Sequence, residues 1–272
     1  MSLRTLALAA FAGIVATSAP AHEFWLEPLD YTLAPGQELQ IEIRIGQEFH
    51  GNEYSYNPDT FFDYSLTDST GKHKIKGRIG DRPSVQMVPE NEGLQVINHF
   101  STSMLLTYRE PDLFTTFLHK KGLDWVLERH KERGLPDVGF SEAYTRFAKT
   151  LVAVGDGAGQ DAPTGMPIEL VALANPYTDD LPDGLPVRLI WQGEPLPDIR
   201  VTIFRKDSHD AEAAISHTTT DENGIATIPV DQSGQYLLNA VHMIIPSPAD
   251  IERTGAVWHS LWASMTFEIG SR

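Results

Sequence analysis

The sequence contains no cysteine, and basic residues are scarce. Without thiols the chain can form neither a disulfide nor a thiolate metal site, so any bound metal must use imidazole, carboxylate, amine or backbone ligands. The 21 lysines and arginines are outnumbered by 37 aspartates and glutamates, which gives a net charge of −16. A surface this acidic repels nucleic acid and anionic lipid, so we predict no nucleic-acid partner.

Long apolar runs are also missing. The most apolar stretch spans residues 6–15, about ten residues, whereas a membrane span needs roughly 20. This stretch follows Arg4 and precedes small residues at positions 19 and 21, the arrangement of a secretory signal peptide. We therefore predict a signal peptide over residues 1–21 cleaved after Ala21, a periplasmic location and no membrane span in the mature chain.

Cleavage after Ala21 would make His22 the first residue of the mature protein. An N-terminal histidine carries two nitrogen ligands, its α-amine and its imidazole Nδ1, which close a six-membered chelate ring on one metal ion. The amine has an ordinary pKa of about 8, and a bound metal displaces its proton. Because no internal histidine offers this pair, His22 is the principal predicted metal ligand.

The first part of the mature chain has the pattern of a β domain. Leu39, Ile41, Ile43 and Ile45 alternate with polar residues, a period of two that predicts a half-buried strand. Turn residues separate further predicted strands at residues 62–67, 72–78, 94–100 and 104–108. We therefore expect a β-sandwich domain over residues 22–110.

Residues 111–154 have a helical pattern. Helices are predicted at residues 112–121 and 123–133, interrupted by Gly122, and a third at residues 141–149 with Ser141 as its N-cap. We interpret this segment as a helical connector that ends in a returning strand.

A glycine- and proline-rich loop over residues 155–167 precedes a second β region. About seven strands are predicted there, at residues 168–174, 187–191, 199–204, 215–219, 226–230, 235–243 and 261–269. This number and spacing fit one sandwich over residues 155–272. The predicted fold class is therefore mainly β, with two immunoglobulin-like or transthyretin-like β-sandwich domains and a short helical insertion between them.

His242 is the predicted second metal ligand. It shares one face of a strand with Tyr236, Leu238 and Ala240, whereas Asn239 lies on the other face. A neutral imidazole beside the nitrogen pair of His22 would suit a divalent metal of borderline softness. The alternative is a core histidine whose ring is satisfied by a backbone carbonyl.

Two other histidines are weaker candidate ligands. His99 lies in a predicted strand, where it faces either the core or a site. His50 lies in a predicted loop close to Glu48 and Glu53 that is able to close over a metal. The sequence contains no His-Glu-x-x-His or Gly-x-Ser-x-Gly enzyme motif. We expect four tryptophans to pack in the core: Trp25, Trp191, Trp258 and Trp262.

The C-terminal region resembles the sandwich of transthyretin-like and carboxypeptidase-regulatory-like modules. The similarity lies in GEPLP at residues 193–197, TDENG at residues 220–224 and the strands around them. The chain as a whole resembles the exported family known as domain of unknown function 4198, in HEFWLEP at residues 22–28, RFAK at 146–149, ELVALANP at 169–176, AVHM at 240–243 and WASMTF at 262–267. This resemblance implies a periplasmic component of nickel or cobalt uptake that supplies an inner-membrane metal transporter.

Together these observations predict a protein that binds nickel, or else cobalt or copper, through His22 and His242 and assists metal uptake. Nitrogen-rich ligation without thiolate suits Ni(II) and Cu(II). Two alternatives stay open. One is a copper-dependent mono-oxygenase in which an N-terminal histidine brace holds the metal, and the other is a structural or adhesive β-sandwich protein without a metal.

Overall fold

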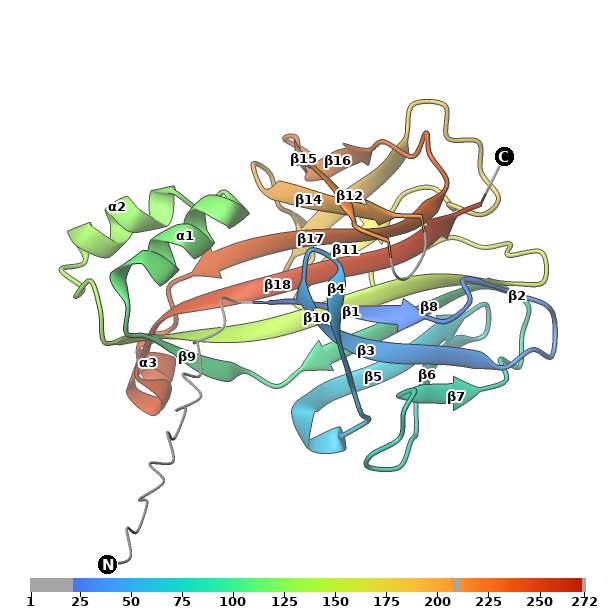
Figure 1. Cartoon of the computed structure of the whole chain (residues 1–272), viewed down its shortest axis with the longest axis horizontal. Helices are drawn as coiled ribbons and strands as arrows, with labels where there is room; N and C mark the ends of the chain where they lie inside the picture. The colour runs from blue at the N-terminus through green and yellow to red at the C-terminus, as the bar shows by residue number, and fades with distance from the viewer. Residues whose placement is uncertain (1–21, 208–210, 271–272) are drawn as a thin grey trace, which may run out of the picture.

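A sheet of ten strands forms the centre of the computed structural model, which describes residues 22–207 and 211–270. The predicted signal peptide, its cleavage site and His209 lie outside the described residues. Figure 1 shows the long strands of this sheet side by side through the middle of the molecule. In spatial order its main strands are β15 (Ala214–Thr219), β14 (Arg200–Lys206), β17 (Gly234–Ile244), β18 (Ala256–Ile269), β10 (Phe140–Val154), β8 (Gly93–Ser101), β5 (Phe61–Asp68) and β6 (Gly71–Lys74). Two short strands, β2 (Thr32–Leu33) and β9 (Met104–Tyr108), also pair with β10.

Two smaller sheets cover opposite faces of the central sheet. One contains β1 (Glu23–Pro28), β3 (Leu39–Gln47), β4 (His50–Tyr54) and β7 (Val85–Met87). The other contains β11 (Ile168–Ala172), β12 (Leu185–Trp191), β13 (Glu194–Pro195) and β16 (Ile225–Ile228). Successive residues of β10 alternate between the two cores, because side chains along a strand point to opposite faces. Ala148 and Val152 pack with the β1–β3 sheet, whereas Phe147 and Leu151 pack with the β11–β12 sheet.

The helices lie at one end of the sheet, where α1 (Pro111–Lys121) and α2 (Trp125–Glu132) pack on Trp258 and Trp262 of β18. The predicted helices at residues 112–121 and 123–133 are confirmed. Gly122 ends α1 in the left-handed conformation, with φ of 71°, and its N–H donates to the carbonyls of His119 and Leu118. A 3₁₀ turn, η1 (Pro58–Thr60), and a short helix, α3 (Pro248–Thr254), complete the elements.

The predicted third helix at residues 141–149 is wrong, because this segment belongs to strand β10. Both faces of β10 are buried, and a strand buried on both faces lacks the alternation that identifies one from sequence. Its polar residues find partners far along the chain: Lys149 forms buried ion pairs with Asp161 and Glu169 at 3.0 and 3.1 Å. Local sequence carries no sign of these contacts.

The mainly β fold with a short helical insertion is confirmed. The two predicted domains share the central sheet, since β10 pairs with β18 in parallel along ten residues. The boundaries predicted at residues 110 and 154 coincide with changes of element, and the sheet continues across both. Among the described residues, no helix is long and apolar enough to cross a membrane.

Candidate functional site

Strand β1 leads directly out of His22 and is fixed to the rest of the molecule along its whole length. All six of its residues are buried. The backbone carbonyls of Phe24 and Leu26 accept hydrogen bonds from Ser264 Oγ and Thr266 Oγ1 of β18, at 2.7 and 2.6 Å. The other edge of β1 pairs antiparallel with β3. The residue before this strand is therefore held in a defined place.

Two acidic side chains of β1 form buried ion pairs that were not predicted from the sequence. Glu23 Oε1 lies 2.7 Å from Lys121 Nζ at the end of α1. Glu27 Oε1 lies 2.7 Å from Lys206 Nζ of β14, and its other oxygen is 3.2 Å from Arg44 Nε. The sequence shows that this segment contains two glutamates, but it does not reveal their cationic partners, which are distant in the chain.

His22 is half-buried, and its backbone carbonyl accepts a hydrogen bond from Arg146 Nη2 at 3.2 Å. In the pairing of β1 with β3, Glu23 lies opposite Gly46. His22 directly precedes Glu23, and on the other side of β3 Gln47 lies opposite His50 of β4. His22 and His50 therefore lie at the same end of this sheet, separated by the width of β3, since adjacent strands are about 4.8 Å apart.

The pairing of β1, β3 and β4 places His50, one of the two weaker candidates, on the same sheet as the strand that follows His22. His50 begins strand β4, so the predicted loop is wrong. The His50 side chain is exposed. Within the described part of the chain, neither imidazole has a hydrogen-bond partner, so both are available to a ligand.

The turn between β3 and β4 holds His50 in place through an unusual backbone. Glu48 and Phe49 both have positive φ, 53° and 65°, as in the two-residue type I′ turn that normally uses Asn and Gly. Such conformations cost on the order of 1–3 kcal/mol each in residues with a side chain. The burial of Phe49 offsets this cost: its ring packs edge-on against Trp25 at 5.5 Å, with Lys206 Nζ 4.1 Å from its centroid.

The structure does not bring His242 to His22. Asn239 accepts a hydrogen bond from Lys121 Nζ at 2.9 Å, and Val241 packs with the helices, so both face the β1 side of the central sheet. His242 faces the opposite side, as the period-two pattern predicts, with its ring 4.7 Å from that of Trp191 on β12. The central sheet separates the two predicted ligands.

His99 is a core residue. Its ring lies 4.9, 5.2 and 5.0 Å from the rings of Phe24, Phe61 and Tyr64, and burial lowers its pKa to about 3. Neither of its nitrogens bonds to another residue described by the structure. The described residues contain no group of three or more His, Asp or Glu side chains placed to hold a metal ion. His22 and His50 lie at the same end of the β1–β3–β4 sheet, and the α-amine of a cleaved His22 would add a third nitrogen there.

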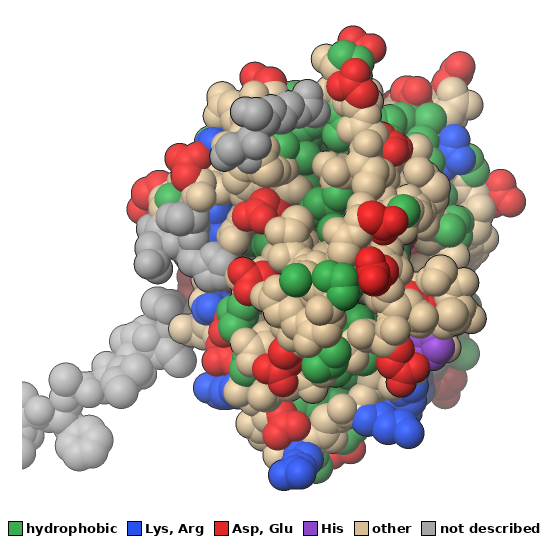
Figure 2. Space-filling view, turned by 90° about the vertical axis from the view of Figure 1, so that its right-hand side faces the viewer, with side chains coloured by type: hydrophobic (Ala, Val, Ile, Leu, Met, Phe, Trp, Pro, Cys, Tyr) green, Lys and Arg blue, Asp and Glu red, His purple; other side chains and the backbone are tan. Residues whose placement is uncertain are grey.

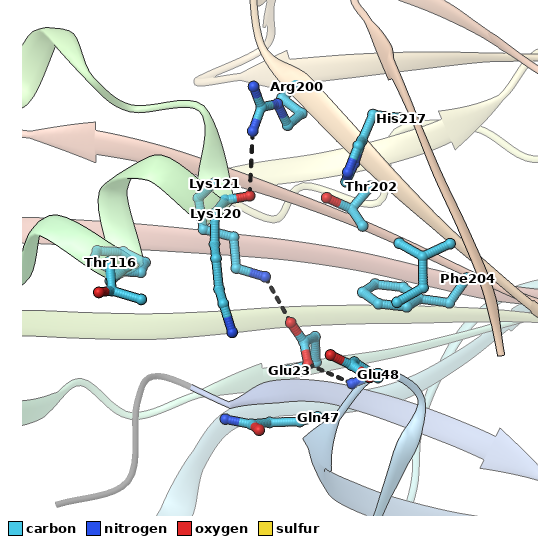
Figure 3. Close-up of a pocket in the computed structure, with 12 residues that line it drawn as sticks. Glu23, Gln47, Glu48, Thr116, Lys120, Lys121, Arg200, Thr202, Phe204 and His217 are labelled. Carbon is cyan, nitrogen blue, oxygen red and sulfur yellow. Dashed lines mark hydrogen bonds and ion pairs between the residues drawn. The ribbon is translucent and has the colours of Figure 1, made fainter. Parts of the chain in front are cut away.

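A cavity of about 260 Å³ lies beside Glu23 and the β3–β4 turn. One wall comes from α1 and another from β14 and β15, and Figure 3 shows Lys121 reaching Glu23 between them. The lining residues are Glu23, Gln47, Glu48, Thr116, Phe117, Lys120, Lys121, Arg200, Thr202, Phe204, Ile215 and His217. Four segments that are distant in sequence thus meet at the start of the predicted mature chain.

The charged groups of this cavity are positioned by contacts with the backbone and with one another. Glu23 Oε2 accepts the N–H of Glu48 at 3.2 Å, in addition to its ion pair with Lys121. Arg200 Nη1 donates to the carbonyls of His119 and Lys120 at 3.0 and 3.4 Å. Burial lowers the pKa of Lys121, whereas its partner Glu23 acts to raise it.

Comparisons with known proteins identify a family but no activity. No curated protein matches the chain. A matching solved structure is described as "Crystal structure of tetra-tandem repeat in extending region of large adhesion protein", with 11% identity and a TM-score of 0.23, a similarity too weak to assign a fold or a function. The match covers 93% of this chain and 50% of that one, so this chain spans about half the length of the structure it matches. The model of the family described as Domain of unknown function (DUF4198) matches residues 19–244, and the chain therefore belongs to this family.

Proposed function

We propose that the exported, mature protein binds one divalent transition metal ion, nickel or cobalt, at an N-terminal His22. In this proposal the metal-loaded protein acts as an accessory to uptake by an inner-membrane transporter. The observation that carries the proposal is the pairing of Glu23 with Gly46 and of Gln47 with His50 at the end of a firmly held sheet. We infer that this register continues by one residue, which sets His22, Gln47 and His50 in one row. A chelating N-terminus on a fixed strand loses little conformational freedom on binding, which favours affinity.

The donor chemistry of this row fits such a metal. The α-amine and Nδ1 of His22 supply two nitrogens, and the imidazole of His50 supplies a third. Nitrogen ligands suit Ni(II) and Co(II), and the chain has no cysteine to favour a thiolate site. Water or the Gln47 amide oxygen can complete the coordination. The guanidinium of Arg146, hydrogen-bonded to the His22 carbonyl, opposes a cation, so the nitrogen ligands must provide the affinity.

His50 replaces His242 as the second ligand in this proposal. Two imidazoles in one row of a sheet can approach the same ion, whereas His242 faces the opposite side of the central sheet beside Trp191. The family that the chain belongs to is described as one of unknown function, so membership alone assigns no activity. It supports the proposal only because the sequence resemblance implies a role in nickel or cobalt uptake.

The proposal is tested with protein purified from the periplasm, whose first residue is identified by mass spectrometry. Titration calorimetry with Ni²⁺ and Co²⁺ and elemental analysis should give one ion per chain. Both His22→Ala and a form that retains Ala21 should lose this binding, because each removes the chelate of amine and imidazole. The matched control is His73→Ala, an exposed histidine in the β5–β6 hairpin, which should bind like the native protein.

The His50→Ala variant tests the proposed second ligand independently of the His22 chelate. It should weaken metal binding at least tenfold, whereas His242→Ala should leave it unchanged. Equal binding by the native protein, His22→Ala and the form retaining Ala21 would refute the proposal as a whole. Loss of binding in His242→Ala but not in His50→Ala would refute only the ligand assignment.

A further inference from the structure

The cavity beside β1 has a charge opposite to that of the molecule around it. Acidic side chains outnumber basic ones in the whole chain by 37 to 21, and Figure 2 shows them spread over one face. The cavity instead contains Lys120, Lys121 and Arg200 against Glu23 and Glu48. A cavity of one sign in a surface of the other concentrates ions of its counter-charge.

The acidic groups of the cavity do not cancel this positive charge. Glu23 already forms an ion pair with Lys121 and accepts the Glu48 N–H. Among the lining residues this leaves the Glu48 carboxylate against Lys120 and Arg200. Lys120 Nζ has no ion pair or hydrogen bond within the described ranges, and Figure 3 shows its side chain extended along the cavity toward Gln47. Burial and Glu23 have the largest effects on the pKa of Lys121. The charge of Lys120 has a smaller effect and lowers this pKa, because the two ammonium groups repel each other. A bound anion would relieve that repulsion.

Part of the cavity lining is apolar. Phe204 of β14 and Phe117 of α1 are almost fully buried, and Ile215 of β15 is 45% exposed. Thr202 and Thr116 add hydroxyl groups that can orient a polar ligand. Small-molecule sites typically combine such an apolar surface with a few converging polar groups.

We propose that this cavity binds a small organic carboxylate, with its anionic end at Lys120 and Lys121 and its apolar body against Phe204 and Ile215. The volume of about 260 Å³ is just below the usual range of about 300–1,000 Å³ for ligand sites, which limits the ligand to a few carbon atoms beyond its carboxylate. The strained turn at Glu48 and Phe49 borders the same cavity, and backbone strain is often retained where a ligand is held. The proposed metal ligands His22 and His50 are not among the residues that line this cavity, whereas Gln47 lines it.

The test is titration calorimetry of the mature protein with hexanoate, acetate, hexylammonium and hexan-1-ol. Hexanoate should bind one to one and at least tenfold more tightly than the other three, because only hexanoate combines the anionic end with the apolar body. Its binding should also change the tryptophan fluorescence, since Lys121 Nζ lies 4.8 Å from the Trp262 ring centroid.

Lys120→Gln should weaken hexanoate binding at least tenfold, and Ile215→Ser should weaken it by a smaller factor. Both side chains are exposed enough that the fold should survive, which circular dichroism checks. Lys131→Gln, at an exposed position of α2, is the matched control and should bind normally. Absence of hexanoate binding, equal binding of hexan-1-ol or an unchanged Lys120→Gln would overturn the proposal. His22→Ala should bind hexanoate normally, so failure of the metal proposal would leave this result unaffected.

Discussion

Lys121 Nζ lies 2.7 Å from Glu23 Oε1, so the end of α1 is joined to the start of β1 by an ion pair between residues 98 positions apart. Both side chains are only 9% exposed. Asn239 accepts a second hydrogen bond from the same ammonium, and the Trp262 ring lies beneath it. The Lys121 ammonium thus connects α1 with β1 and with β17 and β18 of the central sheet, at the place where the predicted mature chain begins.

Removing one member of this pair should be more harmful than removing both. Lys121→Met leaves the Glu23 carboxylate buried without its cation, and loss of one partner of a buried pair costs about 3–5 kcal/mol. We expect a loss of that size in the free energy of unfolding, measured by urea denaturation. The double variant Lys121→Met with Glu23→Gln should recover part of it. A single variant within about 0.5 kcal/mol of the native protein would show that the pair contributes little.

Glu142 should make the protein less stable as the pH rises. It is buried in β10, where it accepts hydrogen bonds from Tyr108 Oη at 2.7 Å and from Ser260 Oγ. Burial raises its pKa to about 7 from an ordinary value of 4.5. The folded state therefore holds the proton more tightly, so this stabilisation is complete below pH 4.5 and is lost as the pH rises to 7. The shift corresponds to on the order of 3 kcal/mol.

The measurement compares the native protein with Glu142→Gln, which cannot ionise, by urea denaturation between pH 4.5 and 8. Because other groups titrate equally in both proteins, the difference between their free energies of unfolding isolates Glu142. That difference should shift by about 3 kcal/mol in favour of Glu142→Gln on going from pH 4.5 to pH 8. A constant difference across this range would show that Glu142 has an ordinary pKa.

The β3–β4 turn should respond in opposite ways to substitutions at its two central residues. Glu48→Gly relieves a positive φ without removing a buried side chain, and should stabilise the protein by about 1 kcal/mol. Phe49→Ala removes a ring that is 1% exposed and should cost about 3–5 kcal/mol. Thermal and urea unfolding check both values. Destabilisation by Glu48→Gly would mean that the turn is not strained at that residue.

Several features follow from local sequence and agree with the structure. Period-two alternation over residues 39–45 predicts β3, because one face of that strand is buried and the other is not. Gly122 ends α1 because it adopts a left-handed conformation that other residues resist. The same period-two rule places His242 with Ala240 and apart from Asn239. In each case the cause acts within a few residues, so it is visible in the sequence.

The sequence by itself determined the mainly β composition, the positions of two helices and the faces of β17. The tertiary structure alone decided that residues 141–149 form a strand, because their burial depends on sheets contributed by both halves of the chain. It also decided that His242 faces Trp191 on the far side of the central sheet and that His50 begins strand β4 beside β3. Strand pairing and buried ion pairs join residues up to 179 positions apart, as in Lys206 and Glu27, and the energy of such contacts exists only once the chain has folded.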